Sequence, residues 1–515
     1  MKPTRLVAAG LFVLVAAVYA VAGPGRIDII DGQYRFEVAR NIIEDGSVQI
    51  RDMSLGDAVP GLIGAYSSYG ISGSLVAVPL VALAKAAGPH SVDREQFFFS
   101  FTSAVFGAGS AVILFLFYTR LGIPAKPAVG WTLVAAFATL SFPASATVFD
   151  QAQQGFFVVA ACYLGWLSAS RGSMGLAVAA GAALAVLVNF QESYAVLLPA
   201  LGFAAWGNPA TPAERRRSFE RCAVVVFAGG AGLLLYAGFN NFRYGSLVYS
   251  GKGLNHPSPL GNPIIGAAGL LFSPGKSIFL YSLPTAIALA GLFRLAREHR
   301  NLARAIAATL LTHFALIATL SFYGGDWCWG PRYFATVLPL AALGFPFARL
   351  RGPLRALGVA AIAAGIVVQL LALSLDHHRF FYARSLPRFF WYADRSFYFH
   401  ESALFARPGE IAESLREGVP SVAEAFRPGP YPELLTYAVF GMWGRPGLTP
   451  PAWMRGYSVF WLPRPWPLWM RTLPRERLPV DPDVALGGLL AAALLGGAAV
   501  VAGVRQLREE THGRA

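Results

Sequence analysis

The chain has 515 residues, of which 55% are hydrophobic and 14% are charged, with a formal net charge of +14. A soluble domain has about 25% charged residues, so this composition excludes an ordinary cytosolic enzyme, a disordered chain and a collagen-like fibre. No basic run is interleaved with aromatic residues, so the charge does not indicate nucleic-acid binding. The stretches 6–25 and 485–504 hold no charged side chain and are long enough to cross a bilayer as helices. The sequence therefore predicts a polytopic membrane protein.

Apolar runs predict an all-α polytopic bundle of about twelve transmembrane helices with external juxtamembrane helices. The apolar stretch 73–88, which holds Pro79, decides the topology. If this stretch does not cross the membrane, the basic loop residues all lie on one side, and the positive-inside rule identifies that side as cytoplasmic. We therefore expect a cytoplasmic N-terminus, an uncleaved first helix, and a stretch 73–88 that dips into the membrane. The predicted spans are 6–25, 97–118, 128–148, 155–170, 174–190, 192–206, 219–239, 277–293, 302–321, 333–348, 356–374 and 485–504.

Three regions follow from this topology. Residues 1–375 form the transmembrane region with its external loops, and residues 485–515 form the last transmembrane helix and a basic cytoplasmic tail. Residues 376–484 form an external, loop-rich segment that is dense in aromatic residues, arginine and proline, which is typical of a membrane interface. The sequence gives this segment no catalytic role.

The first external loop begins with a helical pattern of polar residues. Glu37 and Arg40 fall on one face and Phe36 on another, which predicts an amphipathic helix over 33–45 lying on the outer leaflet. Asp31 comes just before this helix, where an N-cap residue belongs. From spacing alone, Asp31 is either a helix cap or a functional carboxylate.

Later external loops hold further acids and cations. Asp150 ends an apolar run, where an acid usually faces a water-filled cavity or pairs with a cation. Arg243 and Lys276 either hold a phosphate group or extend to lipid headgroups. Asp326 and Arg332 bracket two tryptophans in a short glycine-containing loop, where they form either part of a site or a structural ion pair. These groups suit an anionic, lipid-linked substrate on the external face.

These motifs resemble those of the integral-membrane GT-C glycosyltransferases, which include protein O-mannosyltransferases and aminoarabinose transferases. That family begins its first external loop with an Asp, followed by a short helix with Glu and Arg, and Asp31, Glu37 and Arg40 match this pattern. Gly32 stands where the family often has a second acid. Asp150 is similar to a second external acid of the aminoarabinose transferases. The phrases 242–246, 271–276 and 324–333 are similar to those of a bacterial subgroup, and the resemblance covers roughly residues 5–375.

The resemblance implies transfer of a hexosyl or pentosyl group from a polyprenyl-phosphate sugar to a glycan, lipid or protein acceptor. The reaction would take place on the periplasmic face of a bacterial inner membrane. Asp31, as general base, and Asp150 are the implied catalytic residues. Arg243, Lys276 and Arg332 are expected to converge on the lipid phosphate. The residues expected to bind substrate are Arg35, Glu37, Arg243, Lys276, Asp326, Arg332 and Tyr333.

No cofactor is expected, although a divalent metal is compatible with this chemistry. The sequence has no His-rich or paired-acid set that predicts metal ligands. Membrane lipids and the lipid-linked donor are the expected partners, and nucleic acid is not.

Two other function classes stay open. A transporter or lipid flippase also has many spans and a few charges near cavities, but such proteins often show internal repeats, and the halves of this chain show none. A non-catalytic assembly subunit would keep the fold without the chemistry, and Gly32 in place of a second acid leaves this alternative open.

Overall fold

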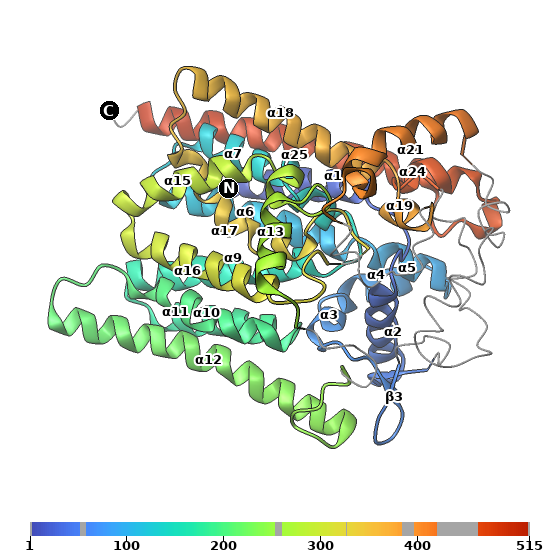
Figure 1. Ribbon diagram of the computed structural model, residues 1–515, viewed down its shortest axis with the longest axis horizontal. Helices are drawn as coiled ribbons and strands as arrows, with labels where there is room; N and C mark the ends of the chain where they lie inside the picture. The colour runs from blue at the N-terminus through green and yellow to red at the C-terminus, as the bar shows by residue number, and fades with distance from the viewer. Residues whose placement is uncertain are drawn as a thin grey trace.

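The computed structural model describes residues 3–51, 58–252, 260–325, 327–383, 396–419 and 462–512. Over these residues the chain is mostly helical and has only three two-residue strands, which confirms the predicted all-α class. The long helices run side by side, and the shorter elements α2 to α5 gather at one end of the bundle with α19, α21 and α24 (Figure 1). The candidate site lies at this end.

The α-helices of the described residues are α1 (Pro3–Ala22), α2 (Ile30–Asp45), α3 (Ser72–Leu75), α4 (Val78–Ala86), α5 (Val92–Phe99), α6 (Thr102–Arg120), α7 (Ala125–Phe137), α8 (Ser141–Ser145), α9 (Gln151–Arg171), α10 (Met174–Val188), α11 (Leu198–Gly202), α12 (Pro212–Tyr244), α13 (Pro263–Phe272), α14 (Ile278–Tyr281), α15 (Thr285–Glu298), α16 (Arg300–Ala318), α17 (Leu338–Ala342), α18 (Pro353–Ser374), α19 (His377–Ala383), α21 (Ala403–Glu417), α24 (Trp466–Trp469) and α25 (Pro482–His512). The 3₁₀ helices are η1 (Glu192–Leu197), η2 (Phe203–Trp206), η3 (Arg332–Thr336), η4 (Phe345–Phe347), η6 (Phe399–Glu401), η10 (Met470–Thr472) and η11 (Arg475–Arg477). Three two-residue strands, β1 (Gln49–Ile50), β2 (Val59–Pro60) and β3 (Ala65–Tyr66), form an antiparallel sheet in the order β1-β3-β2.

Six helical segments are long and apolar enough to cross a membrane, so the chain is a multi-pass membrane protein. The predicted count of about twelve spans is not confirmed, because the search of the described residues finds these six only. The six segments are Pro3–Ala22, Val92–Arg120, Pro212–Tyr244, Arg300–Ala318, Pro353–Ser374 and Pro482–Glu510.

Prolines account for two of the differences. The predicted spans 192–206 and 333–348 are each divided into short 3₁₀ and α pieces, and Pro199 and Pro339 lie in the first turns of α11 and α17. A proline has no backbone N–H to donate, so each run changes from 3₁₀ to α hydrogen bonding near its proline while the backbone stays helical. The predicted span 128–148 likewise ends at Phe137, before the separate short helix α8.

The stretch 73–88 forms α3 and α4 rather than one long helix. Its apolar helical part, Ser72–Ala86, is shorter than a membrane-spanning helix, which agrees with the expectation that it does not cross. The backbone N–H of Ser72 donates to the carbonyl of Asn189 at 3.2 Å, so α3 is fixed against the end of α10.

The predicted amphipathic helix begins three residues earlier than expected, at Ile30. Ile29 is its N-cap, and Asp31 lies inside the first turn, so the prediction of Asp31 as a helix cap is wrong. The helix does not lie with a free polar face on the membrane surface either. Phe36 packs in a buried apolar cluster, and Glu37 on the polar face is buried as well.

The segment after residue 375 is joined to the first helix. The indole Nε1 of Trp466 donates to the carbonyl of Ala20 at 2.9 Å, and that of Trp469 donates to the carbonyl of Pro24 at 3.1 Å. Helix α25 also packs closely along α1, since a Cβ added at Gly10 would lie 2.7 Å from the carbonyl oxygen of Gly496. The C-terminal region therefore borders the same end of the bundle as α2.

Candidate active site

Two acids that are far apart in the sequence meet at one arginine. Asp31 lies in the first turn of α2, and Asp150 directly precedes α9. Nη2 of Arg35 lies 3.0 Å from Oδ2 of Asp150 and 4.0 Å from Oδ2 of Asp31. The three side chains are at most 15% exposed. Arg35, which the sequence predicts as a substrate-binding residue, thus links the two carboxylates that the resemblance marks as catalytic.

Asp31 has three donor groups around its carboxylate. The hydroxyl of Tyr69 donates to Oδ1 at 2.7 Å, and Nη1 of Arg332 lies 3.9 Å from Oδ2, on which Arg35 also borders. These contacts fix the orientation of the carboxylate, and its 15% exposure leaves it reachable from outside. A carboxylate held in this way can accept a proton from a hydroxyl placed within hydrogen-bond distance.

Close packing explains why glycine stands at position 32. A Cβ at this position would lie 2.6 Å from Cγ2 of Val148, so only glycine lets the start of α2 approach the segment that leads to Asp150. A second acid at position 32 would force the two segments apart. The departure from the family pattern therefore reflects close packing that brings Asp31 and Asp150 to the same arginine.

Arg332 connects Asp31 to a cavity. Its guanidinium carbon lies 4.0 Å from the ring centroid of Phe149, and its Nη2 donates to the Tyr333 hydroxyl at 3.4 Å. Burial by itself lowers the pKa of Arg332, but the neighbouring Tyr333 and Asp31 outweigh it and raise the pKa, so the guanidinium stays charged. Gly325, at φ +79°, gives the preceding loop the shape that accommodates the Arg332 side chain.

The cavity beside Arg332 has a volume of about 30 Å³ and is partly open to solvent. Phe149 and Gln151 contribute from the Asp150 side, and Cys328 and Trp329 contribute from the loop before Arg332. Its remaining wall comes from two residues without a predicted role, His377 and Arg464, together with Leu140, Pro143, Ala144, Thr147 and Ala335.

Arg243 stabilises the loop next to Asp31. Its Nη1 donates to the carbonyls of Ser67 and Tyr69, the latter at 3.1 Å, and its Nη2 donates to Oδ1 of Asn240 at 2.6 Å. The side chain is 1% exposed. Arg243 therefore fixes the loop that carries Tyr69, which in turn holds Asp31.

Lys276 supports a different loop. Its Nζ donates to the carbonyls of Cys328 and Gly330 at 3.0 and 3.1 Å, just before Arg332. Arg243 and Lys276 thus bind carbonyls of two different loops. Of the three cations, only Arg332 contacts a predicted catalytic acid in the part of the chain that the structure describes. The expectation that all three converge on one phosphate stays a prediction, but each of the two buried cations already has a structural role.

The other predicted site residues have structural contacts or lie outside the described residues. Oε1 of Glu37 accepts a bond from the backbone N–H of Arg51 at 2.6 Å, which ties α2 to β1. The Tyr333 carbonyl lies 2.9 Å from Nε2 of His313, while its hydroxyl lies beside Arg332. Asp326 lies outside the described residues, so its predicted pairing with Arg332 stays a prediction.

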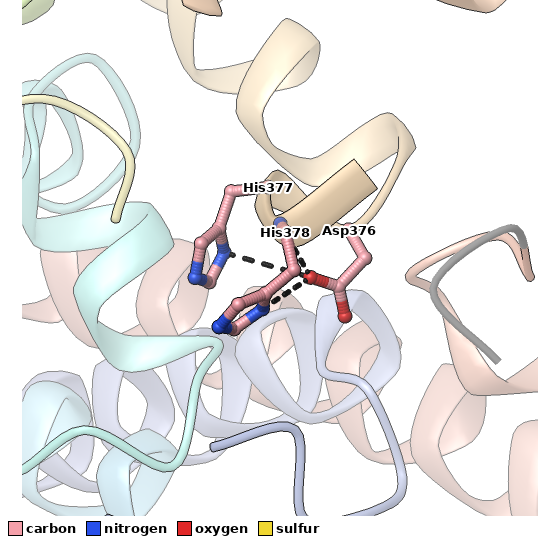
Figure 2. Close-up of side chains that lie close together, drawn as sticks. All are labelled: Asp376, His377 and His378. Carbon is pink, nitrogen blue, oxygen red and sulfur yellow. Dashed lines mark hydrogen bonds and ion pairs between the residues drawn. The ribbon is translucent and has the colours of Figure 1, made fainter. Parts of the chain in front are cut away.

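A second buried cluster lies behind the cavity wall. Figure 2 shows the imidazole rings of His377 and His378 next to one another beside the Asp376 carboxylate. Nδ1 of His378 lies 2.8 Å from Oδ1 of Asp376, and Nη2 of Arg26 lies 3.2 Å from Oδ2. Burial alone would raise the pKa of Asp376, but His378, His377 and Arg26 outweigh it and lower the pKa. Burial, and next the Asp376 charge, raise the pKa of the nearby Asp28.

Two groups of side chains in the described residues have metal-ligating atoms within 4.8 Å of one another. In the first, Asp376 with His377 and His378, both carboxylate oxygens already bind His378 and Arg26. The second consists of Glu44, His90 and Glu95, and its acids pair with Lys85 and Arg40. A divalent cation at either place would compete with existing cationic partners, so neither group is assigned as a metal site.

One signal in the sequence could have pointed to His377. The triplet Asp-His-His at 376–378 directly follows the apolar run of α18, as Asp150 follows an earlier apolar run. Polar residues at such a point face a cavity or a partner of opposite charge. Arg464 has no such signal, because it lies within a proline- and tryptophan-rich stretch.

We predict that Arg243→Gln lowers stability, because it leaves the Ser67 and Tyr69 carbonyls without a charged donor. The expected loss is about 2–4 kcal/mol, the range for removal of buried charge-assisted hydrogen bonds. Thermal unfolding of the purified protein would measure it. The matched control is Arg216→Gln on the same helix, since the Arg216 side chain is 84% exposed. Equal melting temperatures for the two variants would contradict the supporting role of Arg243.

Comparison with known proteins gives structural likenesses only. No family model and no curated protein sequence matches the chain. The structure is similar to ArnT from Cupriavidus metallidurans in the apo state, with a TM-score of 0.48 and 15% identity over 81% of this chain and 80% of that one. It is also similar to the same protein bound to undecaprenyl phosphate, with a TM-score of 0.49 and 15% identity over 84% of each chain.

A third likeness is to an Archaeoglobus fulgidus oligosaccharyltransferase tethered to an acceptor peptide, with a TM-score of 0.40 and 13% identity over 86% of this chain and 59% of that one. The similar structures thus include an aminoarabinose transferase and an oligosaccharyltransferase. All three TM-scores lie below 0.5, so the function proposed below rests on the residues of the site.

Proposed function

We propose that this protein is a membrane glycosyltransferase that moves a sugar from a polyprenyl-phosphate donor to a glycan, lipid or protein acceptor. The observation that carries the proposal is the Asp31 carboxylate, which Tyr69, Arg35 and Arg332 surround, together with the cavity that Arg332 lines. A proton acceptor, Asp31, thus lies next to a positively charged group, Arg332, that can bind a phosphate. These are the two groups that sugar transfer from a phosphodiester needs.

The proposed reaction is a single displacement. The acceptor hydroxyl oxygen bonds to the anomeric carbon, the bond from that carbon to the phosphate oxygen breaks, and the hydroxyl proton passes to Asp31. The bonding electrons leave with the polyprenyl phosphate, whose charge rises from −1 to −2. Arg332 stabilises this added charge because it is fixed in a largely buried site. Asp150 acts through Arg35, which it holds against Asp31.

We propose a bacterial inner-membrane location with a cytoplasmic N-terminus. The basic residues Arg215, Arg216 and Arg217 belong to the start of α12, and that start lies at the end of the bundle away from α2 (Figure 1). If the basic end is cytoplasmic, α2 and the cavity are on the external face. A lipid-linked donor that enters from the membrane can reach them there.

One observation keeps a lipid transporter as the second candidate. The segments 192–206 and 333–348 change between 3₁₀ and α geometry, and transporters often contain irregular helices within the membrane. A transporter would bind the lipid phosphate and move it without breaking the sugar–phosphate bond. A non-catalytic assembly subunit would bind an acceptor complex without either activity. Release of free polyprenyl phosphate from a sugar-bearing donor separates the transferase from both.

We predict that Arg332→Ala weakens binding of undecaprenyl phosphate and lowers turnover, each about 10- to 100-fold. The reason is the loss of one charge-assisted hydrogen bond to the phosphate. Binding of the radiolabelled lipid to the purified protein would measure the first effect. Arg294→Ala is the control, since Arg294 is a partly exposed residue paired with Glu298 on α15. Unchanged lipid affinity in Arg332→Ala would remove Arg332 from the donor site.

A further inference from the structure

The cavity beside Arg332 has an unusual number of unsatisfied polar atoms. Six of its lining residues carry buried nitrogen or oxygen atoms with no hydrogen-bond partner among the residues that the structure describes. Buried polar groups in folded proteins nearly always have a partner, so such a concentration in one cavity indicates a binding site. The atoms are Oγ1 of Thr147, Oε1 of Gln151, Nε1 of Trp329, Nε of Arg332, both ring nitrogens of His377 and Nε of Arg464.

The unsatisfied atoms are mainly donors. The nitrogens of Trp329, Arg332 and Arg464 can only donate, and two of them belong to guanidinium groups. Oε1 of Gln151 can only accept. The complementary ligand is therefore an anion with several acceptor oxygens and a neighbouring hydroxyl group. A phosphate ester of a sugar has this chemistry.

His377 is placed between the cavity and the cluster behind it. Its ring centroid lies 6.0 Å from that of Phe149, the ring on which Arg332 stacks at 4.0 Å. On its other side it lies 4.1 Å from the ring of His378. The side chain is 2% exposed. Nδ1 of His377 lies 3.9 Å from Oδ1 of Asp376, which is beyond hydrogen-bond distance (Figure 2). Two neighbouring rings thus hold the imidazole in place while neither of its nitrogens makes a hydrogen bond among the described residues.

We propose that His377 donates a hydrogen bond to the phosphate group of the lipid-linked donor, and that Arg464 closes the same phosphate site from the C-terminal side. This inference rests on the proposed function and adds residues after 375 to it. During transfer the phosphate gains negative charge as the sugar leaves, and the N–H of His377 stabilises that charge without transferring its proton. The proton of the acceptor still passes to Asp31.

The state of His377 suits this role. Burial, and next the charge of His378, lower its pKa well below the ordinary value and outweigh the opposite effect of Asp376, so the ring is neutral near pH 7. A neutral imidazole has one N–H donor. It can therefore bind a phosphate oxygen without adding a further positive charge to the two guanidinium groups.

The test compares two variants of the full chain in nanodiscs. His377→Phe keeps a ring against Phe149 and His378 but removes both nitrogens, whereas His377→Gln keeps an N–H donor. Affinity for undecaprenyl phosphate and for inorganic phosphate is measured for each, along with thermal stability. The control is His400→Phe, because the His400 side chain is 70% exposed.

We expect His377→Phe to bind undecaprenyl phosphate about 10- to 100-fold more weakly than the parent, the range for one hydrogen bond to a charged group. His377→Gln should recover most of the affinity. The melting temperature of His377→Phe should stay near that of the parent, because the removed nitrogens make no hydrogen bond in the described structure and the Asp376 carboxylate, 3.9 Å from Nδ1, keeps its bonds to His378 and Arg26. A merely structural role of His377 predicts the opposite pair of results.

Parent-like lipid affinity of His377→Phe would overturn the inference. So would a parent protein that binds inorganic phosphate as tightly as undecaprenyl phosphate, since the site would then serve a free anion. Failure of the proposed function gives a different result. In that case His377→Phe still weakens lipid binding, but the parent transfers no sugar.

Discussion

Asp31→Asn should lower sugar transfer about 10²–10⁴-fold, the usual contribution of a positioned general base. The amide has the size of the carboxylate and its oxygen still accepts the bond that Tyr69 donates, but it cannot take a proton from the acceptor hydroxyl. Ile29 is the N-cap of α2, so the substitution removes no helix cap. The effect should therefore appear in turnover, while donor binding changes little.

The role of Asp31 is tested by measuring the turnover of purified Asp31→Asn. Its expression and melting temperature are compared with those of the parent. Asp45→Asn is the matched control, because Asp45 ends the same helix and its side chain is 44% exposed. Activity near that of the parent in Asp31→Asn would remove Asp31 from the mechanism. It would also favour the transporter or the assembly subunit over the transferase.

Asp376→Asn should destabilise the protein by about 3–5 kcal/mol, the cost of removing one partner from a buried ion pair. The carboxylate binds Arg26 through one oxygen and His378 through the other, so the substitution removes the ion pair with Arg26 and leaves only an amide oxygen for His378. Its lowered pKa means that this stabilisation is present at neutral pH and is lost as the pH falls through the folded-state value.

Asp28→Asn is the matched comparison and should have little effect or stabilise the protein slightly. Burial and the Asp376 charge raise the pKa of Asp28 in the folded state. Its contribution to folding stability is therefore present at low pH, where the side chain is neutral, and is lost as the pH rises through the folded-state pKa. An uncharged amide avoids that loss. Unfolding of both variants near pH 7 would measure the difference, and equal losses of stability would contradict the assignment of Asp376 as the paired carboxylate.

Local sequence patterns predicted part of the site. An acid that ends an apolar run indicates a cavity or a cationic partner, and Asp150 has that partner in Arg35. The pairing itself depends on the close packing of Gly32 against Val148, which joins two segments more than 100 residues apart and leaves no periodic signal. The carboxylates could thus be predicted as candidates, but the arginine between them could not be assigned its role.

The roles of Arg243 and Lys276 could not be predicted for a related reason. A cation on an external loop can bind a phosphate, a lipid headgroup or a backbone carbonyl, and the sequence does not distinguish these acceptors. In the structure both cations bind carbonyls of loops that are distant in the chain. His377 was missed because the segment that follows α18 was expected to lie apart from the site, whereas its first turn lines the cavity.

The all-helical class follows from composition, but the number of spans does not. Apolar runs such as 192–206 and 333–348 have the composition of membrane helices, but they form short segments of mixed 3₁₀ and α geometry. Hydropathy reports that a segment is buried in an apolar environment. It does not report whether lipid or protein surrounds the segment.

The most direct test of the central claim is the release of free polyprenyl phosphate from a radiolabelled polyprenyl-phosphate sugar. The purified parent would be incubated in nanodiscs with a cell-envelope extract as the acceptor source, beside Asp31→Asn. A transferase that depends on Asp31 should release the lipid phosphate and label the acceptor in the parent, with at least about a hundredfold lower rate in the variant. A parent that binds or moves the intact donor without breaking the sugar–phosphate bond would contradict the assignment.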